Sequence, residues 1–223
     1  MPWSSWVRST EVEPSLYGAD FARLGAQIET LLDAGCRVFH FDVGDGHFVE
    51  PVTMGPIVLQ SISPIIRGGG AVTDVHLMVE RPAKYFEPFA EAGADSVTFH
   101  YEAVDDVPAT IAAARSHGLG AGVAFNPESE PEDVARVAAE ADIVLCMSIH
   151  PGYSGQPFRE ETYGRIDRLR AALPQHVHIQ VDGGVGEKNV AQLRERGVTL
   201  LVAASSIFNH DDIAEAYRRL AET

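Results

Sequence analysis

Two histidines and two aspartates are the residues of this chain whose types and places could support a shared chemistry. His40 and Asp42 alternate with apolar residues, so both lie on one side of the strand expected at 38–42. His76 and Asp182 stand at the ends of two later expected strands. Imidazole and carboxylate groups bind Zn, Mn, Fe and Co, so four such side chains at one place predict a site for one divalent metal ion.

Each of these residues also has a structural explanation when it is taken alone. His40 and His76 are compatible with buried, hydrogen-bonded core histidines, and Asp42 with a residue that caps the following turn. Asp182 is compatible with a turn residue before Gly183-Gly184. The metal hypothesis therefore depends on a fold that brings the four strand ends together.

The chain alternates between expected strands and helices with short connections, which predicts a parallel sheet. We expect strands at residues 12–16, 38–42, 72–77, 96–100, 120–125, 143–147, 177–181 and 200–203. We expect helices at residues 20–34, 56–66, 82–92, 107–117, 132–139, 160–172, 187–196 and 213–221. Eight such units fit an α/β fold of the (β/α)8 TIM-barrel type, whose active site lies at the carboxyl ends of the strands. The alternative is an open doubly wound sheet, but residues 15–18 do not supply its G-x-G-x-x-G motif.

Small residues follow the last three expected strands. They are Pro151 to Gln156 after the sixth strand, Gly183-Gly184 after the seventh, and Ala204-Ser205-Ser206 after the eighth. Glycine allows the backbone to approach a ligand, and backbone amides there can bind a phosphate without lysine or arginine. Each loop alone is also compatible with an ordinary turn. Together with a metal on the opposite side, they would bracket a small phosphorylated sugar.

Composition limits the class of protein. The 223 residues are 45% hydrophobic and 22% charged, which suits a globular domain at residues 11–223 after a short extension at residues 1–10. The extension lacks the apolar segment of a signal peptide. A net charge of -15 argues against nucleic-acid and membrane partners. The isolated cysteines Cys36 and Cys146 do not suggest a disulfide framework, so we expect a cytoplasmic protein.

The ordered motifs resemble the ribulose-phosphate 3-epimerases (pentulose-5-phosphate 3-epimerases) from Val12 to about Phe208. The matching motifs are P-S-L at 14–16, A-D-F-A-R-L at 19–24, H-F-D-V-x-D-G-H-F-V at 40–49, D-V-H-L-M-V at 74–79, A-G-A-D at 92–95, N-P at 126–127, M-S-I-x-P-G-Y-x-G-Q at 147–156 and V-D-G-G-V at 181–185. The resemblance implies a barrel of the ribulose-phosphate binding type and a homo-oligomer.

The resemblance also implies an activity, the interconversion of D-ribulose 5-phosphate and D-xylulose 5-phosphate through a 2,3-enediolate. Asp42 and Asp182 would be the two acid/base catalysts, and one divalent ion (Zn, Fe, Mn or Co) would bind to them with His40 and His76. The substrate and its phosphate would be bound by Ser15, His76, Gly152, Tyr153, Ser154, Gly155, Gly183, Gly184, Ala204 and Ser205.

Departures from the family pattern lie in the expected substrate loops. They are Gly44 in place of Met, Glu50-Pro51 in place of Pro-Asn, and His150, Ser154 and Ala204 at positions that usually carry other residues. An alternative substrate is therefore a related ketose phosphate such as D-allulose 6-phosphate. A decarboxylase or lyase is disfavoured because residues 42–45 lack the lysine of a D-x-K-x-x-D motif. A catalytically silent sugar-phosphate binding protein is the third alternative.

Overall fold

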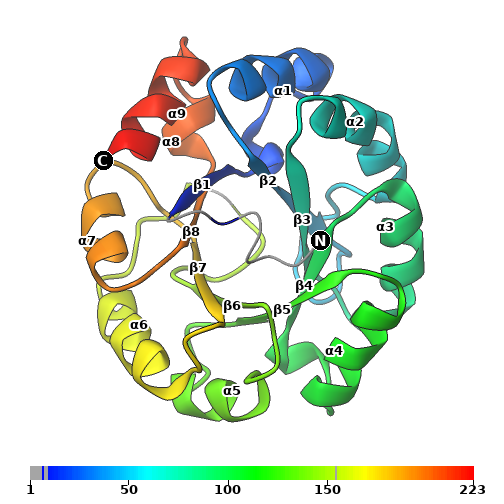
Figure 1. Cartoon of the computed structure of the whole chain (residues 1–223), viewed down its shortest axis with the longest axis vertical. Coiled ribbons are helices and arrows are strands. Elements are labelled where there is room, and N and C mark those ends of the chain that lie inside the picture. Colours follow the sequence, from blue (N-terminus) through cyan, green and yellow to red (C-terminus); the bar gives the residue numbers. More distant parts are fainter. Residues whose placement is uncertain (1–6, 8–9, 154) are drawn as a thin grey trace.

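The computed structural model describes residue 7, residues 10–153 and residues 155–223, and their strands form a ring (Figure 1). The strands are β1 (Glu11–Pro14), β2 (Val38–Gly44), β3 (Val72–Met78), β4 (Ser96–His100), β5 (Gly120–Phe125), β6 (Ile143–Met147), β7 (His178–Asp182) and β8 (Leu200–Ala203). Neighbouring strands pair in parallel in the order β1-β8-β7-β6-β5-β4-β3-β2. A single parallel bridge between Ser15 and His40 joins the two ends of this order. The prediction of a (β/α)8 barrel is confirmed.

Helices surround the ring and cover its outer face (Figure 1). They are α1 (Leu24–Asp33), α2 (Pro56–Gly68), α3 (Phe86–Ala92), α4 (Val107–Ser116), α5 (Pro131–Val137), α6 (Glu161–Ala172), α7 (Val190–Glu195), α8 (Ser205–Phe208) and α9 (Ile213–Glu222). Local signals set several ends: the Asp106 side chain accepts a hydrogen bond from the Ala109 amide at the start of α4, and Gly93 ends α3 in the left-handed conformation.

Two strand boundaries differ from the sequence expectation in ways that matter for the site. The first strand ends at Pro14, and Leu16 begins a short 3-10 helix, so Ser15 lies just beyond the strand and not within it. The seventh strand ends at Asp182, so this residue is the last of the strand and not the first of the loop. The four-residue helix α8 was not predicted, because four residues are too few to show a helical period.

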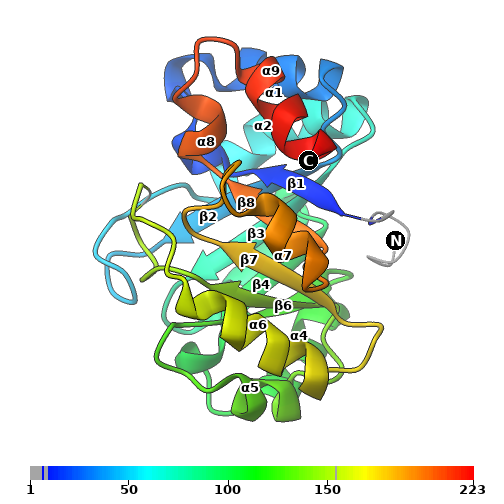
Figure 2. The ribbon, with the colours of Figure 1, turned by 90° about the vertical axis from the view of Figure 1, so that its left-hand side faces the viewer.

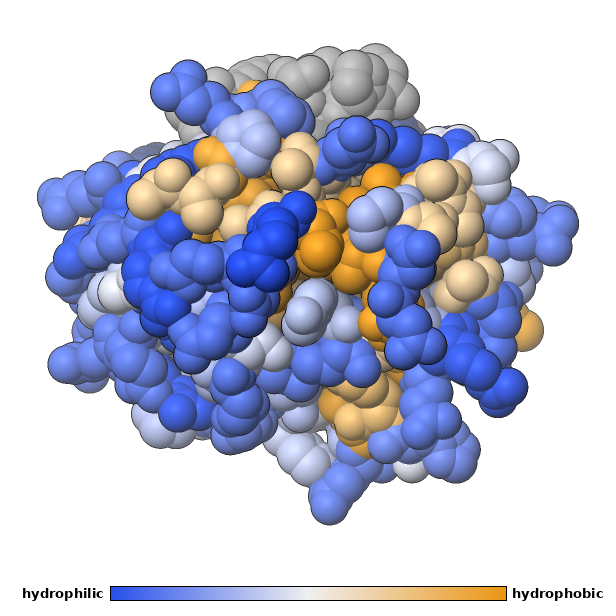
Figure 3. All heavy atoms as spheres, turned by 90° about the horizontal axis from the view of Figure 1, so that it is seen from below, coloured by the Kyte–Doolittle hydropathy of each residue, from blue (hydrophilic) through white to orange (hydrophobic). Residues whose placement is uncertain are grey.

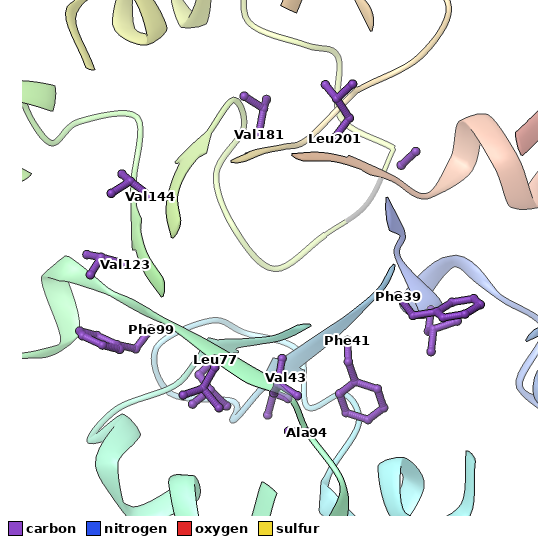
Figure 4. Packing of buried hydrophobic residues seen from close by; sticks show 14 of the residues in the cluster. Phe39, Phe41, Val43, Leu77, Ala94, Phe99, Val123, Val144, Val181 and Leu201 are labelled. Carbon is purple, nitrogen blue, oxygen red and sulfur yellow. The ribbon is translucent and has the colours of Figure 1, made fainter. Parts of the chain in front are cut away.

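The main hydrophobic core lies between the strands and the helices. Along β2, Phe39, Phe41 and Val43 point away from the barrel axis, as Figure 4 shows, and each is buried. The residues between them, His40 and Asp42, therefore point into the barrel. A separate apolar cluster, which consists of Ala124, Leu145, Met147 and Ile149, comes from β5, β6 and the residues that follow β6.

The long loops after β2 and β6 project from the same end of the barrel (Figure 2). These loops carry several of the expected substrate residues, so this end is the candidate mouth. The face shown in Figure 3 is predominantly hydrophilic, with a smaller apolar area. Among the described residues, no helix has both the length and the apolar character required to cross a bilayer.

We predict that Phe41→Ala lowers the free energy of unfolding by about 3–5 kcal/mol, because the substitution removes a fully buried ring and leaves a cavity. Phe41 packs edge-on against Phe89, with 6.1 Å between the ring centroids. The control is Phe21→Ala, which changes a residue that is 49% exposed and should lower stability by about half as much or less. Urea denaturation measures both values, and equal losses would contradict the assigned core.

Candidate active site

The structure brings His40, Asp42, His76 and Asp182 together at the mouth of the barrel. The strand register places Asp42 beside His76, and Asp182 ends β7 beside Met147 at the end of β6. Each of the four residues offers a ligand atom, and these atoms all lie within 4.8 Å of one another. The convergence that the metal hypothesis required is therefore present.

Asp42 is the centre of this group. Its Oδ1 lies 3.3 Å from His40 Nε2 and 3.1 Å from His76 Nδ1. Its Oδ2 accepts a hydrogen bond of 2.6 Å from Ser15 Oγ. Asp182 Oδ2 lies 3.9 Å from His76 Nδ1, on the other side of the group. Both carboxylates thus face the same imidazole from different strands.

The pKa values of the two aspartates are pushed in opposite directions. Burial alone would raise the pKa of Asp42, but the charge of His40 and the contacts with His40 and His76 outweigh it and hold this pKa well below its usual range. Burial, together with the negative charge of Asp42, raises the pKa of Asp182 to about 7. Two neighbouring carboxyl groups with separated pKa values are typical of acid/base pairs.

A second polar layer lies deeper in the barrel, behind His40. His40 Nδ1 lies 3.5 Å from Glu13 Oε2 and 3.4 Å from Asp74 Oδ2. Gln180 Nε2 donates hydrogen bonds to the same two oxygens, at 2.6 and 3.0 Å. Burial raises the pKa of Glu13 to about 7. The sequence analysis missed this layer, although the alternation along β2 and β3 already places Asp74 on the inward face that His76 shares.

His76 also has a partner that the sequence analysis missed. Its Nε2 lies 2.9 Å from Nε2 of His100, and the two rings meet end to end, with 5.1 Å between their centroids and 23° between their planes. Burial lowers the pKa of His100 to about 4, so this ring is uncharged at neutral pH. His100 is a polar residue at the end of a strand, which is the same signal that identified His76.

The residues of the donor set fit a divalent metal ion. Within the described part of the chain, neither buried ring nitrogen of His40 makes a hydrogen bond of good geometry, although carboxylate oxygens lie 3.3–3.5 Å away. Buried polar atoms without partners are rare in proteins and call for an explanation. Two imidazoles and two carboxylates with separations of 3.1–3.9 Å around Asp42 and His76 could supply such an ion with its protein ligands.

Two hollows at the mouth separate the expected substrate residues into two groups. One hollow of about 40 Å³ is lined by residues that include Ser15, Asp42, Gly152, Tyr153, Asp182 and Ala204. The other, of about 650 Å³, is lined by residues that include Gly155, Gly184 and Ser205. The segments after β6 and β8 border both hollows, whereas the turn after β7 borders only the larger one. His76 and Gly183 are not among the residues that line either hollow. Ser154 lies outside the described residues.

Glycine is required at the turn after β7. Gly183 and Gly184 have φ angles of 108° and 64°, in the left-handed region that other residues rarely adopt. A Cβ atom on Gly184 would lie 2.5 Å from the backbone nitrogen of Phe158. The close approach of two loops therefore depends on the Gly-Gly pair that the sequence analysis singled out.

A closed ring of parallel strands, covered by helices and with acids and imidazoles at the carboxyl ends of its strands, defines the class of (β/α)8 barrels with a site at that mouth. The model of the Ribulose-phosphate 3 epimerase family matches residues 11–208. The chain belongs to this family, so the predicted enzyme class, an isomerase of the epimerase type, is confirmed.

Individual relatives match almost end to end. Ribulose-phosphate 3-epimerase of Bacillus subtilis (strain 168) is 35% identical over 210 residues, which cover 92% of this chain and 95% of the relative. The ribulose-phosphate 3-epimerase of Escherichia coli (strain K12) is 38% identical over 204 residues, which cover 90% of each chain. Ribulose-phosphate 3-epimerase 2 of Cupriavidus necator is 37% identical over 218 residues, 95% of this chain and 89% of the relative.

Solved structures share the fold at low sequence identity. The 3-hexulose-6-phosphate synthase from Salmonella typhimurium aligns with a TM-score of 0.70 at 16% identity and covers 96% of this chain and 97% of its own. Orotidine 5'-phosphate decarboxylase from Pyrococcus horikoshii OT3 aligns with a TM-score of 0.68, also at 16% identity, covering 95% of this chain and 97% of its own. These likenesses support the barrel architecture.

Gly44, which departs from the family pattern, lies where the loop after β2 folds back on the strand. Its amide donates a hydrogen bond of 2.7 Å to Thr53 Oγ1, which in turn donates to the Asp42 carbonyl at 2.8 Å. A Cβ atom on Gly44 would lie only 2.6 Å from the Pro51 carbonyl oxygen. The missing side chain therefore does not open space at the mouth, because the loop backbone fills it.

We predict that Gly44→Ala lowers the free energy of unfolding by about 1–3 kcal/mol, because the new methyl group must displace the Pro51 backbone. Gly164→Ala is the control: no atom lies within 4 Å of its Cβ position and the residue lies inside α6, where alanine is favoured, so stability should not fall. Chemical denaturation compares the two variants. A Gly44→Ala variant as stable as the control would show that the loop does not pack in this way.

Proposed function

We propose that this chain is a metal-dependent 3-epimerase that interconverts D-ribulose 5-phosphate and D-xylulose 5-phosphate. The observation that carries the proposal is the pair of carboxyl groups, Asp42 and Asp182, which face one imidazole from different strands at the barrel mouth. Family membership supports the reaction class, and the residues at the mouth supply groups of the kinds that this reaction needs.

Inversion of a carbon next to a ketone requires that a proton leave from one face and that another arrive on the opposite face. A planar enediolate lies between the two steps, and one base cannot readily reach both faces. Asp42 and Asp182 would therefore act in turn, one as base and the other as acid, and exchange roles in the reverse direction. Ser15 orients Asp42 through its hydrogen bond of 2.6 Å.

The divalent ion would be held by His40, Asp42, His76 and Asp182. When bound, Zn, Fe, Mn or Co would act as a Lewis acid and stabilise the negative charge that develops on the C2 and C3 oxygens of the sugar. Glu13, Asp42, Asp74 and Asp182 form their ion pairs with only two histidines, so the carboxylates outnumber the imidazoles. A cation here would also offset the remaining negative charge.

Phosphate binding would fall to the segments after β6, β7 and β8. Backbone amides of Gly155, Gly184 and Ser205 would surround the phosphate at the larger hollow, with Gly183 next to Gly184 in the same turn. Ser15, His76, Gly152, Tyr153, Ser154 and Ala204 would contact the sugar. The hollow beside Asp42 and Asp182 measures about 40 Å³, which suits an ion or a water. Entry of a sugar would then require movement of the loops that carry Glu50 and Tyr153, whose side chains share a hydrogen bond of 3.2 Å.

We predict that Asp42→Asn and Asp182→Asn each lower kcat by at least about a thousandfold, because each removes one of the two proton-transfer groups. The measurement is incubation with D-ribulose 5-phosphate in deuterated water, with mass spectrometry of the label at C3 of the product. Asp105→Asn, which changes an exposed carboxylate, should leave both turnover and labelling unchanged. Near-native formation of labelled D-xylulose 5-phosphate by either active-site variant would disprove the two-base assignment.

We predict that removal of divalent metal by dialysis against a chelator abolishes epimerisation and that adding back a single metal restores it. Enzyme metal content, measured by elemental analysis, should approach one ion per chain in the parent. It should fall below about a tenth of that in His40→Gln, because one of the four ligands is lost. Full activity in metal-free protein would contradict the proposal.

The related ketose D-allulose 6-phosphate is the alternative substrate predicted from the loop residues. The ratio of kcat/KM for the two sugars, measured on one preparation, distinguishes these alternatives. A higher value for the hexulose phosphate would reassign the substrate while leaving the reaction type intact.

We further propose that residues 11–223 act as one domain in the cytoplasm. Both cysteines, Cys36 and Cys146, are buried free thiols, which supports a reducing compartment. A homo-oligomeric state stays a prediction from the family resemblance.

A further inference from the structure

His100 lies at the end of β4, directly behind His76, and has no part in the proposed proton transfer. Its ring is fully buried, lies nearly in the plane of the His76 ring at an interplanar angle of 23°, and is covered by Phe48 with 4.8 Å between ring centroids. The 2.9 Å separation between the Nε2 atoms of His76 and His100 requires that one of them carry a proton and the other accept it.

Glu102 fixes the other side of the His100 ring. Its Oε2 lies 3.3 Å from His100 Nδ1. Its Oε1 accepts hydrogen bonds from the Asn126 amide at 2.8 Å and from Ser129 Oγ at 2.5 Å, so the carboxylate is held in place. An ionised carboxylate can only accept hydrogen bonds, and the proton between Glu102 and His100 therefore belongs on His100 Nδ1.

Four side chains form a row of polar contacts, and the position of each proton in it can be assigned. The row runs from Asp42 through His76 and His100 to Glu102. Each of its three contacts joins two atoms with lone pairs, so each contact needs a proton or a cation between these atoms. Because the N–H of His100 is on Nδ1, toward Glu102, the lone pair of its Nε2 faces His76, and the proton of the contact between the two rings belongs on His76 Nε2. A cation held by Asp42 and by His76 Nδ1 would fill the first contact. The two N–H groups then fill the other two contacts, and every acceptor in the row is satisfied.

We propose that His100, held by Glu102, is a positioning residue that keeps His76 in the tautomer with its proton on Nε2 and its Nδ1 lone pair directed at the metal site. This inference rests on the proposed metal-binding function. Metal-binding histidines often donate their second ring N–H to a carboxylate or carbonyl group, and loss of that partner typically weakens metal affinity by about 10- to 100-fold. His100 and Glu102 would have this role behind His76.

The first test compares zinc affinities, measured by competition with a chromophoric chelator. His100→Leu, which fills similar space but cannot accept a hydrogen bond, should weaken zinc binding by about 10- to 100-fold. His100→Gln, whose side-chain oxygen can accept the His76 proton, should recover most of that loss. His178→Gln is the matched control, because His178 begins β7 at the opposite end of the strands and contacts Thr199, so it should leave affinity unchanged.

The second test observes the tautomers directly and uses the zinc-loaded parent protein. Long-range proton–nitrogen NMR of histidine side chains should show His100 protonated on Nδ1 and bare on Nε2, with His76 protonated on Nε2. The signals are assigned by their loss in His100→Gln and His76→Gln. This measurement does not depend on whether His100→Leu folds. If His100 only filled space, it would not fix the tautomer of His76.

The outcomes separate this inference from the proposed function. A parent protein that binds no zinc would overturn the metal site itself. A parent that binds zinc, together with a folded His100→Leu of equal affinity or a His100 ring protonated on Nε2, would overturn the positioning role alone. Weakened binding in His100→Leu, recovery in His100→Gln and the stated tautomers would together support it.

Discussion

The structure depends on the burial of acidic side chains inside a barrel whose outer wall is apolar. A buried carboxylate is costly unless positive or hydrogen-bonding partners surround it. Glu13, Asp42 and Asp74 are all buried, and the ion-pair partners that the structure gives them are His40 and His76. Interleaved acids and imidazoles thus hold one another in place, and the strand register fixes their order.

Around the site, the polar and the apolar side chains come from different strands. The polar side chains come from β1 to β4 and β7, whereas Ala124 and Leu145, adjacent in β5 and β6, form an apolar cluster with Met147 and Ile149. Apolar neighbours lower the local dielectric response, which strengthens each charge interaction across the interior. Met147 also borders the small hollow that contains Asp42 and Asp182, so this apolar cluster reaches the site itself.

Most of the fold and the centre of the site could be predicted from the sequence. The alternation along β2 predicted that His40 and Asp42 lie on one side of the strand. The repeated strand-then-helix pattern predicted the (β/α)8 barrel. The exact end of β7 could not be predicted, because Asp182 is compatible with both a strand end and a turn. The close approach of the Pro51 carbonyl to Gly44 could not be predicted either, since only the folded loop brings these residues together.

The side chains that contact the histidines from behind show a second limit of prediction from sequence. His100 ended an expected strand and could have been identified by the rule that selected His76. Its pairing with His76, however, depends on the side-chain rotamers of two neighbouring strands, which no periodicity encodes. Gln180 similarly meets Glu13 across 167 residues of sequence, a contact that only ring closure creates.

The closure of the ring itself has a thermodynamic consequence. Most neighbouring strands share several paired residues, whereas β1 and β2 meet through the bridge between Ser15 and His40. This seam has the fewest backbone bonds to resist local opening, and its two residues also contact Asp42. A cation held by His40 and Asp42 of β2 and by Asp182 of β7 would tie together strands that lie on the two sides of this seam. Occupancy of the site and closure of the ring would then be linked equilibria that reinforce each other.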